Sequence, residues 1–363
     1  MTSEEGKPPA ESVNPFISKE VACPVCERKS TQRRIKGHLF VEKNRDVDLR
    51  PLGYQRAKKG LEHIHPLVYY LWHCPHCRYT AWPGAYENPV KVLPLTIAKY
   101  RAVLLEPPGP EKAAGRVWER LSLGLDAPDL DFFLGCKAHL LAIFQLLLVQ
   151  SQTGVRDSLN LARYYLRLSW LYRELAEQPD LAASAGQVRA LIGEMKADWP
   201  QAPGDAEAAA SQAAREYEAV VSTSSAMENV GEVCNLLLLI TRIYIKLRRS
   251  EPARGMWSKA HELIRQTENA KRSLEDQYYR LQDQARSATK VVADAAKAGM
   301  PEISARIVET DALARGMRNK VQEVRGLIHD LDDELVGEGG AAPAPEADED
   351  KPKTKKKFFG LFK

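Results

Sequence analysis

Two identical Cys-Pro-x-Cys pairs constrain this chain more than any other feature of its sequence. Cys23 and Cys26 form the first pair, Cys74 and Cys77 form the second, and 47 residues separate the pairs. Two thiolates in such a pair can be brought onto one metal ion by a tight turn, and Zn²⁺ prefers four soft ligands in a tetrahedron. Each pair therefore supplies half a site. The spacing predicts one zinc ion, held by all four cysteines in a small N-terminal ribbon.

Redox chemistry and ordinary, unliganded thiols are the two alternatives to this zinc site. A Cys-x-x-Cys pair can cycle through a disulfide, but a thioredoxin-type motif needs a βαβ context and only one pair. The six cysteines of a cytosolic chain are expected to stay reduced, so duplicated pairs favour metal. Because four thiolates close the coordination shell, we expect a structural zinc and not a catalytic one.

The same part of the chain contains the only β-strand signals. Short stretches at residues 39–41 and 68–72 are rich in β-branched and aromatic residues and are bounded by turn formers. Residues 1–17 are polar and contain proline, which predicts a disordered arm. We therefore expect a zinc ribbon with a long insertion over residues 18–91.

From about residue 92 the apolar residues follow a helical period. Tyr172-x-x-Leu175 and Tyr244-x-x-Leu247 each end a predicted helix, and they stand 72 residues apart, close to two tetratricopeptide units of about 34 residues. We interpret residues 92–268 as a tetratricopeptide-like helical-repeat domain. Its helices are expected at about residues 92–105, 110–122, 128–151, 155–178, 204–225 and 228–248, with a further helix opening at Glu251-Pro252.

Two apolar seams at a/d spacing follow the repeat domain. The first runs from Leu274 to Ala295 and the second from Ile303 to Leu335, with Gly299-Met300-Pro301 between them. This pattern predicts an antiparallel coiled-coil hairpin over residues 269–337 that turns at residues 299–301. Packing of each seam on the repeat domain is one alternative, and a protruding arm that binds a partner or a second copy is another.

The C-terminal residues 338–363 are rich in Gly, Ala, Pro and charged residues, which predicts a disordered tail. The last nine, Lys355–Lys363, join three lysines to a group of aromatic residues. This group could bind weakly to an anionic membrane, occupy a groove of a partner, or do neither.

The N-terminal residues 1–15 lack the apolar core of a secretory signal peptide. Apolar runs such as Leu140–Val149 are shorter than the roughly 18 residues that a spanning helix needs, so they are interpreted as buried core helices. We expect a cytoplasmic protein, with peripheral membrane association through the tail as an alternative.

Two polar segments of the ribbon admit both structural and functional interpretations. A basic run, residues 28–36, contains Arg28, Lys29, Arg33, Arg34 and Lys36, and either forms a solvated face or contacts phosphates. Residues 45–51, Arg-Asp-Val-Asp-Leu-Arg-Pro, alternate in charge. They form either salt bridges that organise the long insertion or a polar binding surface.

Four blocks of the ribbon resemble the bacterial domain-of-unknown-function 2225 family in order and spacing. They are residues 23–26 (Cys-Pro-Val-Cys), 45–51, 65–70 (His-Pro-Leu-Val-Tyr-Tyr) and 74–81 (Cys-Pro-His-Cys-Arg-Tyr-Thr-Ala). Residues 162–173 also resemble the helical part of that family. The resemblance implies a zinc ribbon with tetratricopeptide-like helices and no established activity. The chain departs from it at Glu27 and Arg78, where such knuckles often carry glycine.

Three classes of function fit this sequence unequally. A protein–protein interaction adaptor uses most of the residues, because helical repeats offer an extended surface and the coiled coil offers an arm. A nucleic-acid-binding protein that acts through the basic ribbon is the alternative. An enzyme is least expected, since the sequence has no glycine-rich phosphate loop, no Ser/His/Asp ordering and no open metal site. The net charge of +4 over 363 residues decides little between the first two classes.

Overall fold

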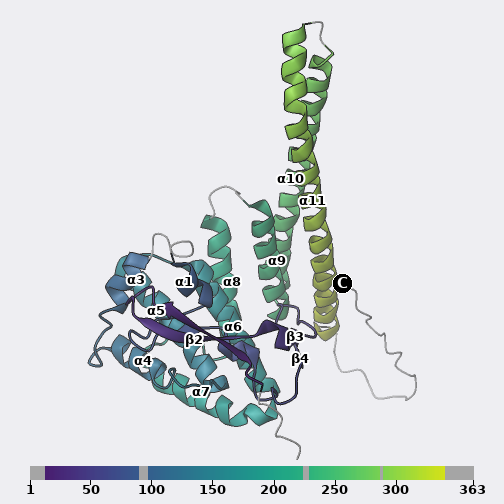
Figure 1. Ribbon diagram of the computed structural model, residues 1–363. Helices are drawn as coiled ribbons and strands as arrows, with labels where there is room; N and C mark the ends of the chain where they lie inside the picture. Colours follow the sequence, from purple (N-terminus) through teal and green to yellow (C-terminus); the bar gives the residue numbers. More distant parts are fainter. Residues whose placement is uncertain (1–12, 90–96, 224–228, 287–288, 340–363) are drawn as a thin grey trace, which may run out of the picture.

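The structure is a computed structural model that describes residues 13–89, 97–223, 229–286 and 289–339. It is mainly α-helical, with short strands confined to the N-terminal part, as the sequence predicts. Figure 1 shows a body of strands and helices from which two long helices rise as an arm. The arm is the only part of the described chain that projects from the body in this view.

Three antiparallel hairpins form the β part of the body. Strand β1 (Phe16–Ala22) pairs with β2 (Lys29–Ile35) in the register Phe16↔Ile35. Strands β3 (Phe40–Glu42) and β4 (Tyr54–Arg56) form the second hairpin, and β5 (Trp72–His73) and β6 (Thr80–Ala81) form the third. The first and third hairpins each enclose one Cys-Pro-x-Cys pair in their turn.

One long apolar helix, α5 (Phe132–Thr153), lies in the core of the body and packs against several of the other helices. Asp131 caps this helix by accepting a hydrogen bond from the backbone N–H of Leu134, and Gly154 ends it in the left-handed conformation. By length and composition α5 is the one described helix that could cross a membrane, but it is buried in the body as a core helix. The other body helices are α1 (Pro83–Glu87), α3 (Ile97–Leu104), α4 (Ala113–Ser122), α6 (Ser158–Glu177), α7 (Ala182–Met195), α8 (Ala206–Thr223) and α9 (Val230–Lys246).

The arm consists of α10 (Ser250–Gln284) and α11 (Lys290–Gly339), which lie against each other along their length (Figure 1). The foot of the arm packs on α9, where Val321, Val324, Ile328 and Leu331 join the main hydrophobic core. Ala314 of the same seam is buried nearer the tip, outside that core. The second apolar seam thus packs on the body at its C-terminal end and only on its partner helix farther out.

Two expectations about the arm are wrong. The chain does not turn at residues 299–301: α10 ends at Gln284, α11 begins at Lys290, and α11 runs straight through Pro301, which is exposed on the helix surface. Proline removes one helical hydrogen bond, but at an exposed position the freed carbonyl can be hydrated. The domain boundary placed between residues 268 and 269 falls inside α10, which continues unbroken from the body into the arm.

Other boundaries also differ from the sequence predictions. The predicted strand over residues 68–72 is a 3₁₀ helix at Pro66–Tyr69 followed by the short β5, because Pro66 fixes the first turn of a helix. Strand β1 begins at Phe16, inside the segment expected to be a disordered arm, and the Phe16 ring is buried. Helix α7 was not expected, since its Gly- and Ala-rich sequence gives a weak periodic signal. The tail at residues 340–363 lies outside the described residues.

Candidate metal centre

Each Cys-Pro-x-Cys pair forms a tight knuckle at the tip of a hairpin. In the first knuckle the Cys23 N–H donates to the Arg28 carbonyl at 2.9 Å, and the Glu27 N–H donates back to the Cys23 carbonyl at 2.9 Å. The second knuckle repeats both bonds, from Cys74 to Tyr79 and from Arg78 to Cys74, at 2.8 Å each. The two knuckles therefore have the same backbone geometry, which the shared sequence pattern implies.

Glu27 and Arg78 adopt the backbone conformation that glycine favours. Their φ angles are 61° and 62°, in the left-handed region. This departure from the family pattern changes the residue and leaves the turn intact. Each side chain gains a contact outside the turn: Glu27 pairs with Arg101 of α3 at 2.7 Å, and Arg78 donates to Ser122 of α4 at 2.9 Å.

The two knuckles bring all four thiol sulfurs together. The Sγ atoms of Cys23, Cys26, Cys74 and Cys77 all lie within 4.8 Å of one another, a geometry that could hold a metal ion. The Sγ–Sγ distance is 3.5 Å between Cys23 and Cys77 and 3.6 Å between Cys26 and Cys74. Four ligands at about 2.3 Å around a tetrahedral zinc would lie about 3.8 Å apart, so the cluster has the size that such an ion requires.

Crowding of the sulfurs sets the protonation of the thiols. Hydrogen bonds from Cys23 and Cys77 lower the pKa of the Cys74 thiol. The same bond with Cys74, together with burial, raises the pKa of Cys23 to about 12. One thiolate therefore suppresses ionisation of its neighbours, and a divalent cation is what would allow all four to ionise together.

A buried glutamine of α5 forms hydrogen bonds with the backbone of the second knuckle. Gln145 donates to the Arg78 carbonyl at 2.7 Å and accepts from the Thr80 N–H at 3.0 Å, and its side chain is buried. The sequence analysis did not single out this residue. Its one signal is that it is the only polar side chain within the apolar run Leu140–Val149.

The histidines near the second pair lie outside the sulfur cluster. His76 is exposed, and its Nε2 lies 3.2 Å from the Lys29 carbonyl. His65 packs against the Phe132 ring, with centroids 4.7 Å apart, and burial lowers the pKa of His65 to about 4. Among the described residues, the four cysteines form the only group of metal-binding side chains.

The alternating segment, residues 45–51, is an internal ion-pair network that joins the ribbon to α6. Asp48 is 1% exposed and accepts hydrogen bonds from the Trp170 indole at 2.9 Å and from Arg173. Arg50, 3% exposed, donates to Glu174 at 3.1 Å and to Glu177 at 2.7 Å. The structural interpretation of this segment is therefore correct, and its partners lie on the helical part instead of within the insertion.

Asp46 extends the same network to α9. It accepts from Arg173 at 2.9 Å and from Lys246 at 2.8 Å. Burial alone would raise the pKa of Asp46, but the hydrogen bond from Lys246 and the nearby arginine hold that pKa below its usual value. Arg242 of α9 also donates to the Val47 carbonyl at 3.2 Å. The segment thus ties the ribbon to two helices.

The basic run is largely engaged within the protein. Lys29 pairs with Glu20 across the hairpin at 2.9 Å, and Lys36 donates to the Asn14 carbonyl at 2.9 Å. The Arg33 guanidinium lies 3.8 Å from the centre of the Phe16 ring and pairs with Asp129 at 3.2 Å. Among the described residues, Arg28 and Arg34 are the exposed members of the run whose side chains have no hydrogen bond or ion pair.

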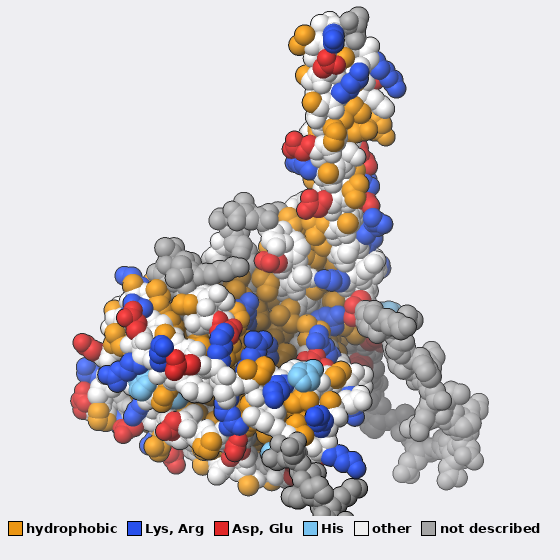
Figure 2. All heavy atoms as spheres, in the orientation of Figure 1, with side chains coloured by type: hydrophobic (Ala, Val, Ile, Leu, Met, Phe, Trp, Pro, Cys, Tyr) orange, Lys and Arg blue, Asp and Glu red, His pale blue; other side chains and the backbone are white. Residues whose placement is uncertain are grey.

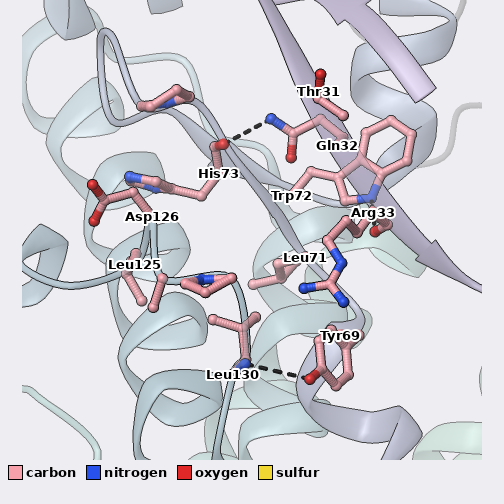
Figure 3. A pocket seen from close by; sticks show the side chains of 13 residues that line it. Thr31, Gln32, Arg33, Tyr69, Leu71, Trp72, His73, Leu125, Asp126 and Leu130 are labelled. Atoms are coloured by element: carbon pink, nitrogen blue, oxygen red, sulfur yellow. Dashed lines mark hydrogen bonds between the residues drawn. The ribbon is translucent and has the colours of Figure 1, made fainter. Parts of the chain in front are cut away.

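A small pocket of about 240 Å³ lies beside the second knuckle (Figure 3). Gln32 of β2 closes one side by donating to the His73 carbonyl at 2.8 Å, and the Tyr69 hydroxyl closes another by accepting from the Leu130 N–H at 3.3 Å (Figure 3). Ligand pockets usually span about 300–1,000 Å³. We therefore assign no ligand to this pocket.

Comparison with known proteins gives one family. Residues 16–100 match the family described as "Uncharacterized protein conserved in bacteria (DUF2225)". This confirms the resemblance for the part of the chain that contains both cysteine pairs and residues 45–51. The resemblance of residues 162–173 lies outside the match. A search of curated proteins and a search of solved structures gave no match.

Proposed function

We propose that the four cysteines bind one structural zinc ion. The donor set supports this, because four sulfur ligands in a tetrahedron are typical of zinc or iron and leave no open position for a substrate. The size of the sulfur cluster supports it further, with Sγ–Sγ distances of 3.5 Å and 3.6 Å. The zinc ion would have a structural role: it would join two short hairpins that have few apolar residues of their own.

We further propose that the protein is a non-enzymatic adaptor for protein–protein interaction in the bacterial cytoplasm. One observation carries this proposal: the outer part of the arm exposes large apolar side chains. Tyr279 is 61% exposed, Val291 78% and Val308 66%. Figure 2 shows hydrophobic side chains gathered on the outer part of the arm, and contiguous apolar patches are typical of a surface that binds another protein. The partner is another protein or a second copy of the chain.

A groove at the foot of the arm adds a second surface for a partner. It has a volume of about 1080 Å³ and lies between the β3–β4 hairpin, α9 and α11. Phe40, Leu238 and Leu239 are among its apolar lining residues, and its charged lining residues are both basic, such as Lys43 and Lys320, and acidic, such as Glu323. A large groove with apolar residues and charges of both signs suits a peptide segment better than a small metabolite.

The experiment is purification from the native host after mild crosslinking, with identification of the proteins that come with the chain. It is repeated with Tyr279→Ser/Val308→Ser, which removes apolar side chains from the arm. Leu123→Ser is the control, since Leu123 is 74% exposed but lies on the body. The proposal expects specific proteins that are lost with the arm variant and kept with the control. Recovery of the same proteins in equal amounts with the arm variant and with the control would contradict the adaptor proposal.

A nucleic-acid-binding function through the ribbon is the second candidate, supported only by the exposed Arg28 and Arg34. The expected result is nucleic acid that co-purifies in the same sample and is lost at high salt, because phosphate contacts release counterions.

The basic and aromatic end of the tail supports a third candidate function, weak membrane attachment. Membrane fractionation of a chain without residues 351–363 tests it, and an unchanged distribution would exclude that role.

A further inference from the structure

Two arginines of α6 have no acidic partner among the described residues, although they lie at the interface between the helix and the ribbon. Arg163 and Arg167 are four residues apart and so project from the same side of the helix. Both are half-buried. Among the described residues neither forms an ion pair, and the one hydrogen bond of the two is a long contact of 3.5 Å from Arg163 to the Asn160 side chain.

Aromatic rings hold these two side chains in place. The Arg167 guanidinium lies 3.5 Å from the centre of the Tyr70 ring and 5.3 Å from that of Trp170. The Arg163 guanidinium lies 5.5 Å from the centre of the Trp82 ring. A guanidinium stacked on a ring keeps its N–H groups free at its edge, where they match the two oxygens of a carboxylate. The pair is therefore ordered before any anion binds.

In the described part of the chain no carboxylate pairs with either arginine, although Glu42 and Glu174 lie near enough to act, together with Arg167, on the pKa of Tyr54. One turn and a half farther along α6, Arg173 is neutralised by Asp46 and Asp48. At Arg163 and Arg167 the neighbours are Tyr70, Trp82 and the buried Tyr217 of α8. Below Tyr70, the fully buried His139 leaves its Nε2 without a hydrogen-bond partner among the described residues. Two like charges four residues apart repel each other, so an anion bound between them removes an unfavourable contact.

We propose that Arg163 and Arg167 bind the acidic run of the chain's own C-terminal tail, residues 346–350. This run places four carboxylates, Glu346, Asp348, Glu349 and Asp350, within five residues. The rings already contact the faces of the arginines, which leaves the N–H edges for carboxylates and no free ring for stacking of nucleobases. This proposal stands independently of the adaptor function.

A series of ion pairs connects the C-terminal part of α11 to α6. Asp332 near its C-terminus pairs with Arg254 at the start of α10, and Lys246 at the end of α9 reaches Asp46, which also contacts Arg173 of α6. Arg167 is six residues from Arg173, about 9 Å along the helix. The eleven residues from 340 to 350 span up to about 36 Å when extended. Figure 2 shows Lys and Arg side chains in the hollow between the body and the foot of the arm.

The test measures binding of a fluorescent peptide of residues 341–351 by anisotropy at low salt. The receptor is the full chain with its own carboxylates neutralised by E346Q, D348N, E349Q and D350N. We expect saturable binding that falls at least tenfold when Arg163→Gln/Arg167→Gln is added, since charge-assisted hydrogen bonds are lost. The unmodified chain should bind the peptide more weakly, because its own tail competes at an effective concentration on the order of 1 mM.

A matched control removes the same charge elsewhere. Arg272→Gln/Arg280→Gln lies on the arm at exposed positions and should leave binding unchanged. If the glutamine pair fails to fold, Arg163→Lys/Arg167→Lys keeps the charge but loses the planar fork, and should still weaken binding. Equal loss in the arm control would mean nonspecific attraction and would overturn the proposal. So would absence of peptide binding, or an α6-dependent affinity for pyrophosphate or single-stranded DNA in its place.

Discussion

Replacing Asp48 by asparagine should destabilise the protein, because Asp48 is the buried carboxylate at the centre of the contact between ribbon and α6. The substitution keeps the shape of the side chain and removes its charge. Arg173, whose side chain is 11% exposed, then loses one of its two carboxylates. Breaking a buried ion pair costs about 3–5 kcal/mol. Because Asp46 remains 2.9 Å from Arg173, we expect a loss of about 2–4 kcal/mol.

The assay is unfolding by guanidinium chloride, followed by circular dichroism and by tryptophan fluorescence, since Trp170 donates to Asp48. The control is Asp129→Asn, which removes a carboxylate that is 77% exposed and pairs with Arg33 at the surface. An exposed pair contributes about 0–1 kcal/mol, so this variant should unfold close to the unmodified protein. If Asp48→Asn lost no more stability than Asp129→Asn, the account of residues 45–51 as a stabilising contact would be refuted.

Three further predictions follow from the ribbon and the core. Removal of metal by a chelator should unfold residues 16–89 before the helices, because metal binding contributes on the order of 10 kcal/mol to the folding of such a ribbon. The four clustered thiols should then react with a thiol reagent, and unchanged thiol reactivity would contradict this prediction. Glu27→Gly should leave stability unchanged or raise it by up to about 1 kcal/mol, because φ is 61° there, whereas Glu27→Ala should bring no gain in a thermal melt. Burial lowers the pKa of His139 from 6.5 to about 4, so the unfolded chain binds the proton first, and stability should fall by on the order of 3 kcal/mol as pH drops from 6.5 to 4. His139→Gln should flatten that part of the measured pH profile, and an unchanged slope would refute the assignment.

Local signals in the sequence were enough to predict the cluster of four cysteines and most of the helices. The spacing within each Cys-Pro-x-Cys pair fixes a knuckle by itself, and the four sulfurs meet as expected. Helix starts were predicted to within a few residues where a capping side chain is present, as at Asp131, Asp157 and Asn229. Such caps act within three residues, so they can be read without knowledge of the fold.

Contacts between distant residues could not be predicted in the same way. The sequence shows that residues 45–51 alternate in charge, but their partners Trp170 and Arg173 lie 122 and 125 residues away from Asp48. Gln145 was missed because its partners are backbone groups of another segment. The turn of the arm was misplaced because the composition of residues 299–301 outweighed the register of the seams. Which helix faces meet is decided by packing, which periodicity alone does not determine.

The most direct test of the central claim is metal analysis of the purified full-length protein combined with X-ray absorption at the metal edge. The account predicts one zinc ion per chain with four sulfur ligands at about 2.3 Å, and loss of that ion in Cys23→Ser. Iron in place of zinc, nitrogen or oxygen in the ligand shell, or a protein that folds fully with no bound metal would contradict it.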